Sequence, residues 1–201
     1  MTRESFDGTA LLSQAASEPD RVRRHLFVAA AIREVFPTEP IVVGGLAEDF
    51  YTGDDYKPTD LDMCARVGVE QRKALEALGL ERDGRHWYHE DGHVAVEFPE
   101  ELIDGDESRT LLVQVGSGAA RIIGLDDLYL DRLRRATASE SVTDIAFKGA
   151  VVIATVRFED LDWKYIRDRI LAEPLGPNMR TLNRKVRVAA GKAIRRALRS
   201  E

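Results

Sequence analysis

The sequence predicts an α+β protein, a mixed β-sheet flanked by helices and followed by a C-terminal helical region. Two observations predict this class. Short apolar runs bounded by turn residues recur up to about residue 124, and one pair of runs has a strong hairpin signal. Beyond that point apolar residues recur at helical spacing with few turn signals. We therefore expect a core domain with N-terminal helices over 1–124 and a helical domain with a basic tail over 125–201.

The first half of the chain alternates predicted helices and strands. Pro19 favours the start of a second N-terminal helix, because proline is tolerated in a first helical turn. Gly79 indicates the end of a later helix. In chain order we expect helices over 9–36, a buried strand over 41–43, a short helix over 46–51, a strand through 61–66 and a helix over 70–78.

The next segment predicts a hairpin with arms over 86–89 and 93–98 around Asp91-Gly92. In its second arm Val94 and Val96 share one face, and Glu97 lies on the other. Further strands are expected over 111–115 and 121–123, followed by helices over 126–137, 142–157, 162–172 and 180–199.

Composition predicts a soluble cytoplasmic protein. No apolar run approaches the roughly 18 residues of a membrane span, and the N-terminus lacks the apolar stretch of a secretory signal. The single cysteine, Cys64, fits a reducing compartment and is expected to be a buried thiol. We expect no membrane partner.

Charge is distributed unevenly along the chain. From Arg180 onward there are eight Lys or Arg residues and one acid, so this tail carries +7 and the rest carries −13. A basic end on an acidic body indicates an anionic partner for the tail. A solvated amphipathic helix is the alternative interpretation.

Three acids and a glycine pair predict the chemistry. Gly44-Gly45 follows the first buried strand, where a backbone turn can approach a ligand closely. Asp60 and Asp62 are expected on one face of the next strand, because side chains alternate with period two. Glu97 lies among apolar residues and needs a partner. Carboxylates that hold Mg²⁺ opposite a phosphate-binding turn are typical of a phosphoryl or nucleotidyl transfer site.

Each feature has a purely structural alternative. Gly44-Gly45 is compatible with a simple turn, Asp60 and Asp62 with a polar surface, and Glu97 with a half-exposed sheet. Lys57 and Thr59 either contact phosphates or shape the loop before Asp60. Zinc binding by His86, His89 and His93 is disfavoured, because no cysteine or suitably spaced carboxylate accompanies them.

The segments Val42-Val-Gly-Gly-Leu-Ala-Glu-Asp-Phe-Tyr-Thr-Gly and Lys57-Pro-Thr-Asp-Leu-Asp resemble the signature of the DNA polymerase β-type nucleotidyltransferase superfamily. The AbiEii-like branch, which includes toxins of toxin–antitoxin pairs, is the most similar. The resemblance implies a nucleotidyltransferase fold. It implies phosphate binding by Gly44 and Gly45, metal ligation by Asp60 and Asp62, and a third acidic role for Glu97 as ligand or general base.

The chain also departs from the family pattern. Gly45 replaces the serine of many relatives. Arg132 matches a basic residue of the following helices, whereas Thr143 and Phe147 stand where a Lys and an Asp are common. Lys148 is a candidate substitute for the missing lysine.

The function expected from the resemblance is transfer of a nucleoside monophosphate from an NTP such as ATP to a hydroxyl acceptor. Mg²⁺ or Mn²⁺ is the expected cofactor, RNA such as a tRNA end is the candidate acceptor, and an antitoxin is the candidate partner. Two alternatives are a nucleotidyltransferase acting on a small aminoglycoside-like molecule and a non-catalytic nucleotidyltransferase-like binding module.

Overall fold

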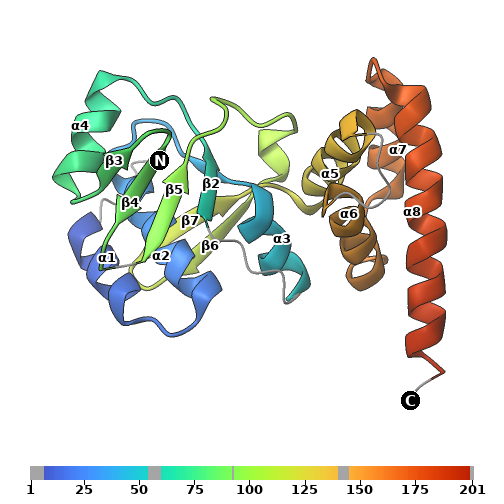
Figure 1. Cartoon of the computed structure of the whole chain (residues 1–201), viewed down its shortest axis with the longest axis horizontal. Coiled ribbons are helices and arrows are strands. Elements are labelled where there is room, and N and C mark those ends of the chain that lie inside the picture. Colours follow the sequence, from blue (N-terminus) through green and yellow to red (C-terminus); the bar gives the residue numbers. More distant parts are fainter. Residues whose placement is uncertain (1–6, 54–59, 92, 140–144, 200–201) are drawn as a thin grey trace. The chain divides into compact units, whose positions relative to one another are not determined.

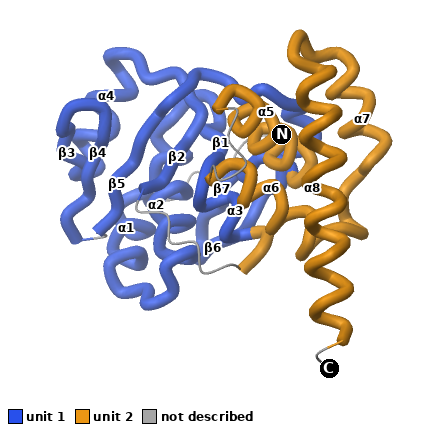
Figure 2. Tube along the Cα trace, turned by 45° about the vertical axis from the view of Figure 1, so that its right-hand side comes forward, with its two compact units in different colours: residues 1–50, 55–124 blue, residues 51–54, 125–201 orange. Residues whose placement is uncertain are grey.

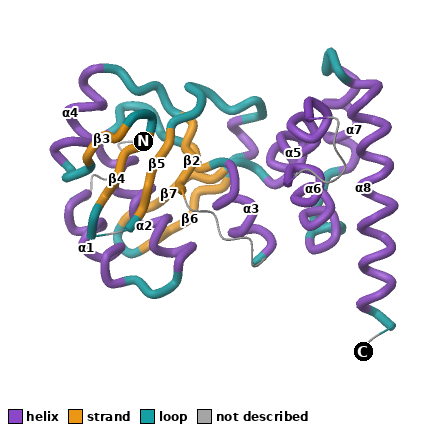
Figure 3. The backbone as a smooth tube through the Cα atoms, viewed as in Figure 1, coloured by secondary structure: helices purple, strands orange, loops and turns teal. Residues whose placement is uncertain are grey.

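A computed structural model describes residues 7–53, 60–91, 93–139 and 145–199. The chain divides into two compact units (Figure 2). Unit 1 comprises Met1–Phe50 and Asp55–Gly124, and unit 2 comprises Tyr51–Asp54 and Leu125–Glu201. All strands of the described residues lie in unit 1, and the long C-terminal part of unit 2 is helical (Figure 3). The predicted α+β class, a mixed sheet flanked by helices, is confirmed at this level.

The described part of unit 1 contains a seven-stranded mixed sheet with the order β3-β4-β5-β2-β1-β7-β6 (Figure 1). Its strands are β1 (Ile41–Val42), β2 (Asp60–Cys64), β3 (Glu81–Asp83), β4 (His86–His89), β5 (Val94–Glu97), β6 (Leu111–Val115) and β7 (Gly118–Ile122). Strand β2 is central, antiparallel to β1 and parallel to β5. The parallel pairing therefore places β2, which carries Asp60 and Asp62, directly beside β5, which carries Glu97.

Helix α2 (Arg21–Val35) is the main support of the sheet, and it packs on β2, β6 and β7. Its residues from His25 to Arg33 are all buried, which fits a helix enclosed by neighbouring elements. Asp20 caps its start by accepting a hydrogen bond from the Arg23 amide at 2.8 Å. The other helices of this unit are α1 (Gly8–Ser17), α3 (Gly44–Thr52, which ends in unit 2), α4 (Val69–Ala77) and the short η1 (Glu107–Arg109).

Glu39 joins the end of α2 to the sheet. Its carboxylate pairs with Arg33 of α2 and with Arg121 of β7, and Arg121 also donates to the Thr110 hydroxyl at 2.9 Å. Partial burial raises the pKa of Glu39, but the two guanidinium groups outweigh that effect and hold the pKa below its ordinary value.

Unit 2 consists of helices α5 (Leu125–Ser139), α6 (Ile145–Val156), α7 (Trp163–Ala172) and α8 (Gly176–Ala197) in its described part. Tyr129 is fully buried at their centre and donates a hydrogen bond to Asn183 Oδ1 at 2.7 Å. The Trp163 ring meets the Tyr129 ring edge-on at 5.7 Å between centroids. These contacts fix α7 and α8 against α5.

Two expectations about elements were incomplete. Strand β3 was not predicted, because Glu81–Asp83 is polar and exposed and pairs only as an edge strand with β4. The predicted start of the last helix at residue 180 was wrong: α8 begins at Gly176, because Pro177 fits the first helical turn. Gly92 of the hairpin lies outside the described residues. Cys64 is buried, as predicted, and none of the described helices is long and apolar enough to cross a membrane.

Candidate functional site

Three neighbouring strands align acidic and imidazole side chains across one face of the sheet. Asp62 of β2 is in register with Glu97 of β5, and Glu97 is in register with His86 of β4. Residues in register on adjacent strands point to the same face. Asp60 lies on that face too, because it is two residues before Asp62 in β2.

The ligand atoms that come closest together belong to Asp60, His86 and Glu97. One side-chain oxygen or nitrogen of each lies within 4.8 Å of the others. Oxygen ligands bind Mg²⁺ at about 2.1 Å, so two ligands on opposite sides of the ion are about 4.2 Å apart. A shift of less than about 1 Å would therefore let this trio close around a divalent cation.

The sequence predicted that Asp62 would bind the ion together with Asp60 and Glu97. In the structure the trio contains His86 instead, and the Asp62 carboxylate lies against Gly44. Gly44 begins α3 with a positive φ of 68°, and a Cβ atom added there would lie 2.2 Å from Asp62 Oδ2. Asp62 thus lies at the N-terminus of α3, where the helix dipole favours a negative charge.

Arg85 and His86 are the neighbours of Glu97, whose side chain is only 14% exposed. Arg85 Nε lies 3.5 Å from one carboxylate oxygen, and His86 Nδ1 lies 3.8 Å from the other. Arg85 itself is 74% exposed, so its guanidinium has room to leave when another cation approaches. A second cation could therefore replace Arg85 beside the Glu97 carboxylate.

His25 of α2 contributes a further group that the sequence did not single out. It is 4% exposed, and its Nδ1 lies 2.7 Å from the Arg21 carbonyl oxygen. A carbonyl oxygen can only accept, so Nδ1 carries the proton and Nε2 presents a lone pair. Nε2 is buried and has no hydrogen-bond partner among the described residues.

Burial lowers the pKa of His25 below its ordinary value of 6.5, and the charges of Arg21 and Arg24 act in the same direction. The hydrogen bond to Arg21 and the negative charge of Asp60 oppose this shift. His25 is therefore neutral near pH 7.

A salt bridge between Arg21 and Asp49 connects α2, which carries His25, to α3. Arg21 donates to Asp49 Oδ2 of α3 at 2.6 Å, and the Asp49 side chain is only 5% exposed. The same residue supplies the carbonyl bonded to His25. Arg21 thus links the start of α2 both to the helix that follows Gly44 and to the histidine.

The remaining predicted site residues have different positions. Gly45 follows Gly44 in α3. Lys57 and Thr59 lie outside the described residues. Thr143, one of the positions where the chain departs from the family pattern, also lies outside them. Arg132 and Lys148 lie in unit 2, in α5 and α6. Arg132 is buried and pairs with Asp131 at 3.3 Å, whereas Lys148 is exposed.

The hairpin histidines do not converge on each other. His86 and His89 are three residues apart in β4 and so point to opposite faces, and His93 is exposed beyond the strand end. His86 instead meets acids from β2 and β5. Its proximity to the acids was missed because the sequence predicts the hairpin of β4 and β5 but does not reveal that β5 also pairs with β2.

Comparison of the chain with known protein families, with curated proteins and with solved structures finds no match. Interpretation of the cluster therefore depends on its geometry and on the resemblance of its motifs.

Replacing His25 by Gln should make the free energy of unfolding depend less on pH below neutrality. Below about pH 6.5 the unfolded chain takes up a proton on His25 that the folded chain resists, so wild-type stability falls with decreasing pH. Urea unfolding between pH 7.5 and 5.5 should show a smaller loss for His25→Gln. Parallel curves for the two proteins would contradict the assigned shift.

Gly44→Ala should destabilise unit 1 more than Gly84→Ala. Both glycines have φ near 60°, at 68° and 59°, so both variants incur similar backbone strain. Only the Cβ at position 44 meets Asp62, whereas the one at 84 has no described atom within 4 Å. We expect a loss of about 1 kcal/mol at position 84 and at least about 2 kcal/mol at position 44, measured by urea unfolding. Equal losses would exclude the close Gly44–Asp62 packing.

Proposed function

We propose that this protein is a metal-dependent nucleotidyltransferase that moves a nucleoside monophosphate from an NTP to a hydroxyl acceptor. The observation that supports it most is the convergence of Asp60 and Glu97 in unit 1, with Asp62 on the same face beside Gly44. The order of motifs along the chain supports it independently, because the strand, glycine pair, helix and Asp-x-Asp strand resemble the superfamily signature.

Electrostatics explains why this cluster needs a cation to accept a nucleotide. Three carboxylates on one face repel a triphosphate, and Arg85 offsets only part of that charge. A divalent ion held by Asp60, Glu97 and His86 would supply the missing positive charge and polarise the phosphoryl oxygens. The residues present fit such an ion, since they offer two carboxylates and one imidazole.

The imidazole refines the expected cofactor. Mg²⁺ prefers oxygen ligands, whereas imidazole suits transition-metal ions. A site that includes His86 should therefore accept Mn²⁺ at least as well as Mg²⁺. If His86 instead remains paired with Glu97, the two carboxylates keep the oxygen-rich character that Mg²⁺ requires.

The proposed reaction is an in-line displacement. The acceptor hydroxyl oxygen forms a bond to the α-phosphorus of the NTP, and the bond from that phosphorus to the bridging oxygen breaks, releasing pyrophosphate. The hydroxyl proton passes to a carboxylate, for which Glu97 is the proposed base, because it is partly buried beside Asp60 and its neighbour Arg85 is exposed. The phosphate-binding role expected for Gly44 stays a prediction, because the Asp62 carboxylate lies against Gly44 at the start of α3.

Two other functions remain as alternatives. The net charge of −13 outside the basic tail favours a cationic small-molecule acceptor of the aminoglycoside type. Phe147 in α6, where an acid is common in the resembling branch, favours a binding module without catalysis. RNA is the acceptor that we favour, because the C-terminal helix is strongly basic. The toxin role and the antitoxin partner stay predictions.

Asp60→Asn and Asp62→Asn should each lower transfer of an α-labelled NMP to acceptor RNA by at least about 100-fold, because loss of a residue that merely orients a metal ligand already costs about 10–100-fold. Incubation with Mg²⁺ or Mn²⁺, each labelled NTP and total RNA measures this. The matched control is Asp91→Asn, which removes an exposed acid at the hairpin tip.

Thermal unfolding separates a chemical from a structural effect. Removing one carboxylate relieves repulsion, so Asp60→Asn should unfold at the same temperature as wild type or higher. Undiminished transfer by both site variants, or an equal loss in Asp91→Asn, would exclude the proposed site. Absence of NTP binding by the wild type in calorimetric titration would favour the non-catalytic module.

A further inference from the structure

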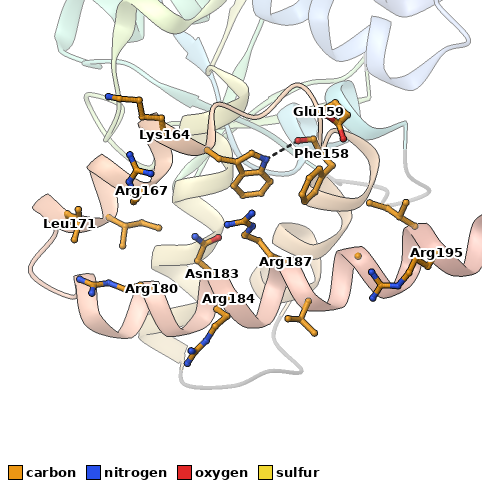
Figure 4. A pocket seen from close by; sticks show the side chains of 15 residues that line it. Phe158, Glu159, Lys164, Arg167, Leu171, Arg180, Asn183, Arg184, Arg187 and Arg195 are labelled. Atoms are coloured by element: carbon orange, nitrogen blue, oxygen red, sulfur yellow. Dashed lines mark hydrogen bonds between the residues drawn. The ribbon is translucent and has the colours of Figure 1, made fainter.

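We propose that the cleft between α7 and α8 of unit 2 binds the phosphate backbone of single-stranded RNA. The cleft has a volume of about 1210 Å³ and runs along much of α8 (Figure 4). It lies entirely within unit 2 and is formed by residues absent from the candidate site of unit 1.

Positive charge dominates the walls of the cleft. Six cationic side chains line it and only one acid, Glu159, does. The cationic residues are Lys164 and Arg167 of α7 together with Arg180, Arg184, Arg187 and Arg195 of α8. Helix α8 contains seven Lys or Arg residues and no acid between its first and last residue. The cleft therefore has a strong preference for an anion.

At least half of these cationic side chains have no carboxylate partner among the described residues. Lys164 and Arg167 share the exposed Asp168, at 2.9 and 3.4 Å. Arg180, Arg184 and Arg195 are exposed and have no carboxylate partner among the residues that the structure describes. Exposed guanidinium groups spaced along one groove are well suited to successive phosphates, which they bind through paired N–H donors.

The length of the cleft indicates a polymer rather than a single nucleotide. Arg180 and Arg195 lie fifteen residues apart on α8, which is about 22 Å at about 1.5 Å per residue. An NTP would reach only part of this row. An extended strand would contact arginines along its whole length, as in the positively charged grooves that follow single-stranded nucleic acids.

Apolar side chains also line the cleft and can contact the non-phosphate part of a strand. The large ones are Phe158, Trp163, Ile170 and Leu171, together with Val188 and Ile194 of α8. Arg187 covers the Trp163 ring at 4.6 Å, and Phe158 is the other aromatic residue of the lining. Aromatic and apolar contacts to bases beside cationic contacts to phosphates are typical of proteins that bind single-stranded nucleic acids.

This inference deepens the proposed function, because it names where the RNA acceptor would be held. It is tested separately from transfer, by fluorescence anisotropy of a labelled U20 oligoribonucleotide with the full-length protein in EDTA without NTP. Arg180→Gln and Arg195→Gln should each weaken binding about five-fold and reduce the slope of log K against log salt by about 0.7. The double variant should lose about 25-fold.

Arg199→Gln is the matched control, because Arg199 is exposed just beyond α8 and does not line the cleft. It should weaken binding less than two-fold. An equal effect of Arg199→Gln, or no effect of the cleft variants, would overturn the proposal. Binding of poly-L-glutamate in preference to U20 would overturn it in favour of an acidic protein partner.

Asp60→Asn distinguishes the two proposals. It should bind U20 as tightly as the wild type while failing to transfer nucleotide. Retained transfer to RNA with unchanged affinity in the cleft variants would overturn the cleft and leave the site in unit 1 intact.

Discussion

Repulsion between carboxylates on adjacent strands is the constraint from which the rest of the account follows. The alternation of β5 buries Val94 and Val96, which forces Glu97 onto the opposite face. Parallel pairing with β2 then brings Glu97 beside Asp62 and near Asp60. Two unit charges 4.8 Å apart repel by about 3.5 kcal/mol at an effective dielectric constant of about 20. A cation bound between the two carboxylates would remove this repulsion, which is the physical basis of the proposed metal site.

The two units carry clusters of opposite charge. Unit 1 brings acids together on one face of its sheet, with Arg85 as a cationic neighbour of Glu97. Unit 2 concentrates arginines along α8, and Arg180, Arg184 and Arg195 have no carboxylate partner among the described residues. A site that attracts a cation and a cleft that attracts an anion are the two components that transfer of a nucleotide to RNA requires. The net charge of the chain is therefore the sum of an acidic region in unit 1 and a basic region in unit 2.

Much of the fold could be predicted from local pattern, because alternation and helical spacing are recorded in neighbouring residues. The positions of Asp60, Asp62 and Glu97 on their strands followed from period two alone. His86 could not be assigned, because its approach to Asp60 depends on β5 lying between β4 and β2. His25 could not be assigned either, because its buried lone pair results from packing of α2 on the sheet. The cleft of unit 2 requires two helices, and the basic tail alone indicated only its charge.

Anomalous diffraction from crystals grown with Mn²⁺ tests the central claim most directly. The account predicts one strong peak in unit 1 at about 2.2 Å from carboxylate oxygens of both Asp60 and Glu97. A peak elsewhere, or an Asp60 carboxylate turned into solvent with no peak beside Glu97, would contradict it.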